Sequence, residues 1–477
     1  MSNATTPETG INCLLYAGWR GSGLNRLRQP AVVNLASTRR SRQNKDSSVT
    51  FFNMLLDSPT LDSSPSLHPA TQSAAAQTQP IDYDVAIVGG GIVGLTLACA
   101  LKESGLRIAL IEAKVESAAV SRGQAYHVNL LSSRIFAGIG VWSQMRPGVN
   151  PIEQIRLSDQ DYPGTVQFKL QDLQTPALGY VSEHRVLLEG LRSFLTQCDR
   201  VTSLCPVEVV TTQFEPDGVA LTLRQDGQEW NVRSRLLVAA DGARSPIRQK
   251  AGISTIGWQY WQSCVVAFIK PEKAHRNIAY ERFQADGPFA ILPLPENLCR
   301  IVWTAPKQEA AAILALKEDE FLAKLKTRYG DQMGELELVG DRYLFPVQLM
   351  HSRQYVQPRL ALIGDAAHCC HPVGGQGVNL GIRDAAALAE VLQTAHQQGK
   401  DIGELTVLRR YERWRKLENW KILAFTDLLD RLFSNNILPI VMLRRLGLWM
   451  LQHLYPVKQI ALRLMVGLSD RAPNLAK

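Results

Sequence analysis

The feature that most constrains this chain is the glycine-rich run Gly89-Gly90-Gly91-Ile92-Val93-Gly94. It has the form G-x-G-x-x-G and follows the short apolar segment 83–88, which predicts a β-strand. An apolar helix is predicted to begin within the run, and a second strand is predicted over 107–111. In such a βαβ unit the N–H groups of the turn lie at a helix N-terminus, where they favour a pyrophosphate.

The end of the second predicted strand supports this interpretation. Glu112 lies close to the offset of about 20 residues at which an acid accepts hydrogen bonds from ribose hydroxyls. We therefore predict that Gly89, Gly91, Gly94 and Glu112 bind a dinucleotide. The motif does not separate FAD from NAD, and a structural glycine-rich turn is the alternative.

Residues 1–80 differ from the rest of the 477-residue chain. The first fifty residues contain six Arg and Lys45 against Glu8 and Asp46, and the segment is rich in small polar residues. This composition predicts a disordered leader. Its Arg-rich, acid-poor start resembles an organellar transit peptide, and a start codon placed too far upstream of a compact domain is the alternative.

Beyond the leader the pattern predicts an α/β fold, α+β overall, with two interleaved domains and a helical end. The predicted Rossmann-like nucleotide-binding domain, which the resemblance described below assigns to FAD, consists of 81–150 with 176–200, 235–250 and 345–395. The predicted mostly β substrate domain consists of 151–175 with 201–234 and 251–344. Residues 396–477 are predicted to be helical.

Two later segments identify the nucleotide by resemblance. The segment Leu237–Ser245, with Asp241-Gly242, resembles the strand-plus-DG motif of flavoprotein aromatic hydroxylases. The segment Ala361–His368, with Gly364-Asp365, resembles their second FAD motif. The resemblance implies that these four residues contact FAD, with Asp365 holding the ribityl chain.

A further segment narrows the family. His371-Pro372-Val373-Gly374-Gly375-Gln376-Gly377-Val378-Asn379-Leu380-Gly381 is similar to a stretch of the ubiquinone-biosynthesis hydroxylases, and the resemblance covers roughly 81–470. Segment 122–126 and the pair Cys369-Cys370 resemble the cyanobacterial branch. The resemblance implies FAD contacts for residues 374–377 and for Asn379, Arg122 and Arg185. A surface position is the alternative for Arg185.

The glycines at 374–377 also have a physical reason. They precede a predicted helix, so N–H groups and the helix dipole can face the N1–O2 edge of the flavin ring, where negative charge collects on reduction. Pro372 is expected beside the reacting face, with an ordinary turn proline as the alternative. For His368 and His371 we expect hydrogen-bonding roles, because no further ligands complete a metal site nearby.

The resemblance implies an activity. FAD reduced by NAD(P)H would use O2 to hydroxylate the phenolic ring of a prenylated quinone precursor, of the ubiquinone or plastoquinone type. No side chain is evident as the base. The alternatives are an isoprenoid quinone reductase, a halogenase, whose W-x-W-x-I-P element is absent from the sequence, or a flavin-binding component of a quinone-biosynthesis complex without turnover.

The C-terminal end predicts a membrane contact. Segment 438–451 combines broad apolar surface with Arg444, Arg445 and Trp449, as in helices that lie in the membrane interface with arginines on anionic head groups. A helix packed on the core is the alternative. Basic residues gather in this tail, which favours lipid over nucleic acid as the partner. We expect a peripheral protein, on the cytoplasmic face of a prokaryotic membrane or on an organelle membrane if 1–80 is a transit peptide.

Overall fold

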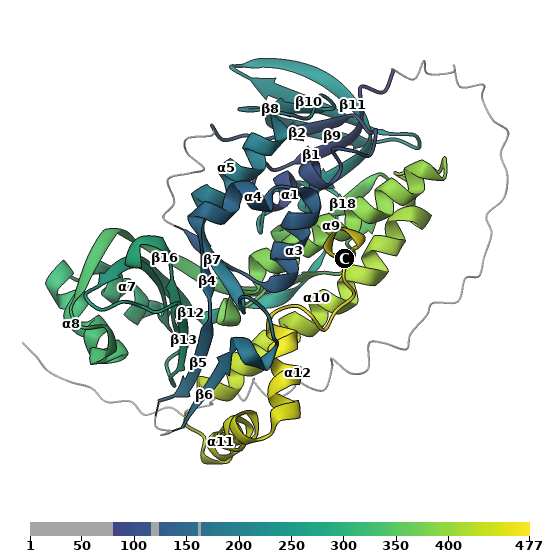
Figure 1. Cartoon of the computed structure of the whole chain (residues 1–477). Helices are drawn as coiled ribbons and strands as arrows, with labels where there is room; N and C mark the ends of the chain where they lie inside the picture. The colour runs from purple at the N-terminus through teal and green to yellow at the C-terminus, as the bar shows by residue number, and fades with distance from the viewer. Residues whose placement is uncertain (1–79, 116–123, 161–163) are drawn as a thin grey trace, which may run out of the picture. The chain divides into compact units, whose positions relative to one another are not determined.

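The fold places three β-sheets beside a group of long C-terminal helices (Figure 1). A computed structural model describes residues 80–115, 124–160 and 164–477. Arg122 and the leader up to residue 79 lie outside the described residues. The mixed α/β class expected from the sequence is confirmed.

The first sheet carries the nucleotide-binding topology. Its strands run in the order β17-β18-β11-β1-β2-β8, and those from β18 to β8 are parallel. The residues of β2 and β18, the central residues of β1 and the C-terminal end of β11 are apolar and buried, as strands in the middle of a covered parallel sheet require. The bounds are β1 (Tyr83–Val88), β2 (Ile108–Ile111), β8 (Val201–Leu204), β11 (Gln228–Ala239), β17 (Val356–Gln357) and β18 (Leu360–Leu362).

Helix α1 (Ile92–Ala100) is apolar on all sides because it is enclosed. It contacts α5 (His184–Leu195) and α9 (Gly377–Gln397), and only Val93 is not fully buried. Helix α9 also contacts α3 (Leu130–Ile139) and α10 (Leu405–Phe433). This packing fixes the glycine turn that precedes α1 at the edge of the sheet.

The expected domain boundaries need two corrections. Strands β9 (Glu208–Phe214) and β10 (Val219–Gln225) extend the first sheet through β11, and β8 pairs with β2, so 201–234 does not belong to the substrate domain. The reason is that β11 runs unbroken from the hairpin with β10 into its pairing with β1. Conversely, residues 345–352 lie in β16 of the second sheet.

The second sheet has the order β19-β16-β12-β15-β14-β13-β5-β6, and only β13 and β5 are parallel neighbours. Helix α7 (Lys307–Ala315) and helix α8 (Glu318–Tyr329) pack against it around buried residues such as Trp303. The bounds are β5 (Gln154–Asp159), β6 (Thr165–Lys169), β12 (Thr255–Pro271), β13 (Ile278–Phe283), β14 (Phe289–Pro293), β15 (Cys299–Pro306), β16 (Leu336–Ser352) and β19 (His368–Cys369).

The described chain also contains a small third sheet and, toward its C-terminal end, three successive helices, besides the short helices α4 (Trp142–Met145) and α6 (Pro246–Lys250). The sheet pairs β3 (Ala125–Val128) and β4 (Val149–Ile152) with β7 (Gly179–Glu183). The helices are α10, α11 (Leu438–His453) and α12 (Tyr455–Met465). Within the residues described, no helix has the length and apolar character needed to cross a bilayer.

Candidate active site

Four turns that lie far apart in the sequence meet at one edge of the first sheet. They follow β1, β2, β11 and β18, which are adjacent and parallel, so their carboxyl ends lie together. The turns carry the G-x-G-x-x-G glycines, Glu112, Asp241-Gly242 and Gly364-Asp365 respectively. Ligands of open α/β sheets bind outside the carboxyl ends of the strands, at the point where the strand order reverses.

The first glycine turn admits no larger residue at two positions. Gly89 has a φ of +115°, and a Cβ there would lie 2.3 Å from the carbonyl oxygen of Ala240. A Cβ on Gly94 would lie 1.9 Å from the carbonyl oxygen of Gly89. Gly91, by contrast, faces open space within the candidate site. Two glycines therefore pack the turn together, while the third leaves room for a ligand.

The three predicted acids have different surroundings. Glu112 accepts hydrogen bonds from the N–H groups of Gly90 at 2.7 Å and Lys114 at 2.8 Å. Burial raises the pKa of Asp241, and its Oδ1 has no hydrogen-bond partner in the described part of the chain. Asp365 faces the cavity described below, and desolvation by the surrounding protein raises its pKa. Asp241 thus retains an acceptor for a ligand hydroxyl.

The loop before α9 has the conformation that its glycines permit. Gly374 and Gly375 have φ values of +68° and +61°, in the left-handed region that favours glycine. Pro372 and residues 374–377 line the cavity. No side chain caps the N-terminus of α9 or that of α1. The free N–H groups of both helices therefore favour negative charge on a ligand.

Asn379 lies behind this loop. Its side-chain amide donates to the carbonyl oxygens of His127 at 2.8 Å and Gly375 at 2.9 Å. Its Oδ1 accepts from the N–H of Asn129 at 2.9 Å. The geometry gives Asn379 the role of tying the loop to β3, and its predicted contact with the cofactor stays a prediction.

His371 and His368 both form hydrogen bonds. His371 Nδ1 accepts from the N–H of Val373 at 3.3 Å, and its Nε2 lies 3.3 Å from the Gln262 side-chain oxygen. Burial lowers the pKa of His371 to about 4, so it is neutral at physiological pH. His371 therefore connects the loop of residues 371–376, which we call the flavin-side loop, to β12.

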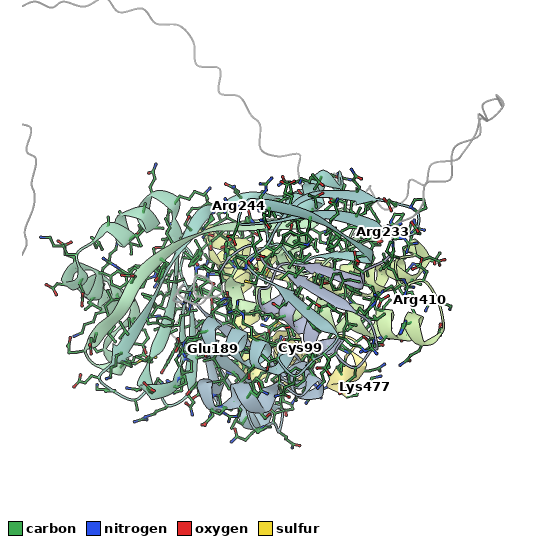
Figure 2. All side chains as sticks on the ribbon, turned by 90° about the horizontal axis from the view of Figure 1, so that it is seen from above. Cys99, Glu189, Arg233, Arg244, Arg410 and Lys477 are labelled. Atoms are coloured by element: carbon green, nitrogen blue, oxygen red, sulfur yellow. The ribbon has the colours of Figure 1, made fainter. Side chains whose placement is uncertain are left out.

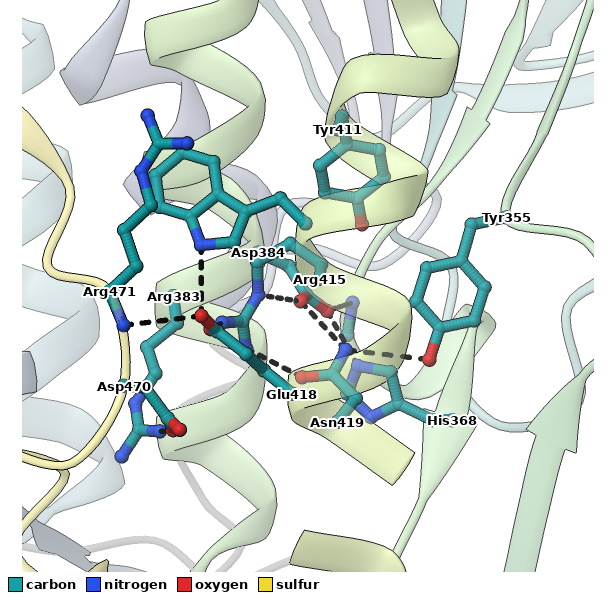
Figure 3. A network of polar contacts seen from close by, with 12 residues as sticks. Tyr355, His368, Arg383, Asp384, Tyr411, Arg415, Glu418, Asn419, Asp470 and Arg471 are labelled. Carbon is teal, nitrogen blue, oxygen red and sulfur yellow. Dashed lines mark hydrogen bonds and ion pairs between the residues drawn. The ribbon is translucent and has the colours of Figure 1, made fainter. Parts of the chain in front are cut away.

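His368 belongs to a buried polar network around Asp384, drawn in Figure 3. Asp384 accepts from the N–H of Gly364 at 3.1 Å and from Arg415 at 2.9 Å, and lies 2.6 Å from His368 Nε2. Asn419 also donates to it at 2.9 Å. Burial would raise the pKa of Asp384, but His368 and Arg415 outweigh burial and lower it to about 2.

This network connects three parts of the chain. Arg415 on α10 pairs with Glu418, whose carboxylate accepts from the backbone N–H of Arg471 at 3.2 Å. Asp384 on α9 binds the turn after β18. The helical end of the chain therefore supports the Gly364-Asp365 turn (Figure 3).

One cavity of about 950 Å³ joins the turns after β1, β11 and β18 to the second sheet and to the C-terminal helices, whereas Glu112 does not line it. Its walls are mainly apolar, with a few polar side chains, as is usual for small-molecule sites. The second sheet contributes Cys264, Val266, Glu281, Ala290, Leu292, Arg300, Val302 and Thr304. The last two helices contribute Arg444, Gly447, Leu448, Leu451, Val457 and Ala461.

Arg185, for which a cofactor contact was predicted, does not line this cavity. Its half-exposed side chain forms an ion pair at 3.5 Å with Glu189, which is labelled in Figure 2. Its neighbour His184 does line the cavity. The contact of Arg185 with FAD stays a prediction.

Sequence reasoning missed several polar cavity residues, among them Tyr126, His127, Glu281 and Arg300. Tyr126 lies in segment 122–126, for which the only signal was a resemblance to the cyanobacterial branch. No local sequence motif marks these positions, because they reach the cavity only through the pairing of strands that lie far apart in the sequence.

The arrangement fits FAD. Two helix N-termini without side-chain caps, an acid with a buried unpartnered oxygen, and a glycine facing open space lie around one edge of the sheet. These are the groups that a pyrophosphate, ribose or ribityl hydroxyls, and a flavin ring require. Gly91, Gly242, Asp365 and residues 374–377 all line the same cavity.

Comparison with known proteins agrees with this geometry. The family described as "FAD binding domain" matches residues 82–426. Ubiquinone hydroxylase UbiL of Rhodospirillum rubrum is 39% identical over 394 residues, covering 82% of this chain and 91% of that protein. The 3-demethoxyubiquinol 3-hydroxylase of Escherichia coli is 33% identical, covering 81% and 98%.

A cyanobacterial protein and a solved structure add to this. An uncharacterized protein of Synechocystis sp. is 52% identical over 402 residues, covering 84% of this chain and 97% of that protein, which supports the resemblance to the cyanobacterial branch. The p-nitrophenol 4-monooxygenase PnpA of Pseudomonas putida has the same fold, with a TM-score of 0.69 at 18% identity over 81% of this chain and 98% of that chain. The chain belongs to the FAD-dependent ubiquinone-biosynthesis hydroxylase family, and it is a flavoprotein monooxygenase.

Proposed function

We propose that this protein hydroxylates the phenolic ring of a prenylated quinone precursor, with NAD(P)H as reductant and O2 as oxygen source, at a membrane surface. FAD held by Gly91, Gly242, Asp365 and residues 374–377 would supply the redox chemistry, which is hydride acceptance from NAD(P)H and activation of O2. The chain's own groups bind and orient the cofactor and the ring, and the apolar cavity excludes water.

The observation that carries the proposal is the extent of the cavity. It begins at the flavin-binding turns, passes the apolar face of the second sheet, and ends at the inner faces of α11 and α12. A phenol ring against the sheet and a prenyl tail toward the helices would fill such a space. A small polar phenol needs no apolar extension of this kind.

The outer faces of the same two helices support a membrane contact. Nine of the seventeen large apolar residues that are exposed in the described chain lie between 437 and 460. On α11, Met442, Leu446 and Trp449 face outward, whereas Arg444 and Leu448 face inward. A lipid tail could therefore pass between the helices and stay within the bilayer.

One expectation about this region is wrong in part. Arg444 was expected on anionic head groups, but it is buried and forms an ion pair at 2.8 Å with Asp159. Arg444 lies on the inner face of α11 because the outer face of this helix carries the exposed apolar side chains. The proposed membrane contact therefore rests on apolar side chains more than on Arg444.

The test uses the purified protein with FAD and 2-geranylphenol as the probe. We expect the probe to stimulate oxidation of NADH or NADPH and to gain a hydroxyl group, and we expect liposomes to increase the rate. Oxidation of NAD(P)H that is stimulated by a prenylated benzoquinone, and not by 2-geranylphenol, would favour a quinone reductase. Tightly bound flavin without stimulated oxidation would favour a component of a biosynthetic complex that has no turnover.

A genetic measurement would assign the pathway. Deletion of the gene should cause a prenylated phenol that lacks one ring hydroxyl to accumulate. Its ring and tail, identified by mass spectrometry, would distinguish a ubiquinone precursor from a plastoquinone precursor.

A further inference from the structure

Glu281 is a carboxylate in an apolar part of the cavity wall. It lies on β13, where its strand neighbours are Ala290 on β14 and Leu157 on β5. All three residues line the cavity. Within the described residues, the Glu281 side chain has no hydrogen bond and no ion pair.

A second acid on the same sheet shows the contrast. Asp159 on β5 pairs with Phe283, two residues beyond Glu281, and its carboxylate is held by Arg444 at 2.8 Å. A buried carboxylate that serves only the fold is expected to have such a partner, because burial of an unpaired charge is costly. Glu281 lacks such a partner among the described residues and is half-buried at the cavity wall, so a ligand in the cavity can reach its carboxylate.

The protonation of Glu281 suits a role in acid–base chemistry. Burial raises its pKa to about 8, near the pH at which a general base works best. Burial also lowers the pKa of Arg300, which lies on β15 in the same wall, to about 10. The other titratable or charged groups around this part of the site are Cys264, Tyr126, Asp430 and the pair Arg444–Asp159.

The position of Glu281 relates it to the flavin-side loop. Gln262 on β12 contacts His371, which precedes Pro372. Across the sheet, Glu281 pairs with Ala290, Ala290 with Val302, and Val302 with Val266 on β12, and all four residues line the cavity. The carboxylate therefore belongs to the wall that meets the flavin-side loop, on the side where the second sheet would hold the substrate ring.

We propose that Glu281 is the catalytic base of this hydroxylase and that its carboxylate binds the phenolic O–H of the substrate and takes the proton. The O–H bond breaks, its electron pair stays on the phenolate oxygen, and the proton moves to a carboxylate oxygen of Glu281. The phenolate directs more electron density into the ring, so the ring carbon attacks electrophilic oxygen more readily. This role rests on the proposed function.

The test compares Glu281→Gln with wild type, using 2-geranylphenol as the probe. The amide keeps the size and can still bind a hydroxyl group, but it cannot accept the proton. We expect hydroxylation kcat to fall by about 100-fold with a small change in KM. We also expect the wild-type rate to rise with pH through about 8, and this rise to be absent from the variant. Glu281→Asp should restore part of the rate.

Two controls separate this role from a structural one. Glu337→Gln removes an exposed carboxylate from β16 of the same sheet and should leave the rate and the pH profile unchanged. In Glu281→Gln, FAD content and NAD(P)H oxidation without the probe should equal those of wild type. Infrared difference spectra should show a carboxylic acid band that titrates near pH 8 in wild type and is missing from the variant.

The possible results separate a failure of the role of Glu281 from a failure of the proposed function. Wild-type hydroxylation together with an undiminished Glu281→Gln rate and an unchanged pH profile would overturn the role of Glu281 and leave the proposed function intact. Absence of the titrating infrared band from wild type would also overturn that role. A wild-type protein that binds FAD but hydroxylates no prenylphenol would overturn the proposed function, and the role of Glu281 with it.

Discussion

His368 Nε2 and Asp384 Oδ2 lie 2.6 Å apart in the interior of the protein, and the same carboxylate accepts from the N–H of Gly364. Asp384 therefore bonds to residues on both sides of Asp365, to Gly364 before it and to His368 after it. Arg415 supplies the positive charge that offsets its burial. A residue that contacts no ligand in the proposed site thus sets the shape of a flavin-binding turn.

Replacement of Asp384 by Ala should destabilise the protein and weaken FAD binding. Removal of one partner from a buried ion pair leaves the other charge uncompensated, and Arg415 would lose a partner at 2.9 Å. We expect a loss of about 3–5 kcal/mol in the free energy of unfolding. Thermal melting and flavin retention measure the effect. The matched control Glu189→Gln breaks an exposed ion pair and should cost less than about 1 kcal/mol.

Asp384 also predicts how stability depends on acid. Its pKa in the folded protein, about 2, lies below the ordinary 3.8, so its ionised form stabilises the fold above about pH 4. This contribution, about 2 kcal/mol, is lost as the pH falls through about 2. Chemical denaturation of wild type and Asp384→Asn across this range should show a smaller acid dependence in the variant. Equal slopes would contradict the assigned pairing.

Two glycines of the first turn should respond differently to Ala. In Gly94→Ala the added Cβ would collide with the Gly89 carbonyl oxygen, so we expect poor folding and no flavin. In Gly91→Ala the Cβ meets no protein atom within 4 Å, so the apoprotein should melt as wild type does. FAD affinity of Gly91→Ala should nevertheless fall by about ten-fold or more, because the methyl group enters the ligand's space. Unchanged affinity in a titration would place the pyrophosphate elsewhere.

The apolar outer face of α11 should determine membrane binding. The double variant Met442→Glu and Leu446→Glu places charge on two exposed apolar positions. We expect binding to anionic liposomes to fall by about ten-fold or more in a flotation assay, since each change removes apolar burial. Phe214→Glu, on β9 of the first sheet, is the matched exposed control and should bind as wild type does. Equal loss in both proteins would argue against a specific face.

Local constraints explain what the sequence could predict. The pattern of strand and turn located the glycine turn and Glu112 without knowledge of the tertiary fold. Asp241 and Asp365 also follow apolar strands, but the resemblance to flavoprotein hydroxylases was needed to assign them to FAD. Parallel pairing of β18, β11, β1 and β2 then brought the turns to one edge. Gly374 and Gly375 were recognisable from the resemblance of segment 371–381 to the family and from their place before a predicted helix, and their positive φ values show that glycine is favoured there.

The remaining features depend on distant contacts. Segment 201–234 was expected in the mostly β substrate domain, and only the continuity of β11 places its hairpin with β10 in the first sheet. Arg444 was expected at the surface because its partner, Asp159, lies 285 residues away. Glu281 has no motif of its own, and its importance follows from the absence of a partner in a wall formed by the second sheet.

Labelling with isotopic O2 would test most directly whether this protein hydroxylates a prenylphenol. The holoprotein is supplied with NADH or NADPH, 2-geranylphenol and isotopically labelled O2, and the product is analysed by mass spectrometry. The account predicts a hydroxylated ring whose new oxygen comes from O2 and whose yield follows NAD(P)H consumption. An unmodified probe, with all consumed O2 recovered as hydrogen peroxide, would contradict it.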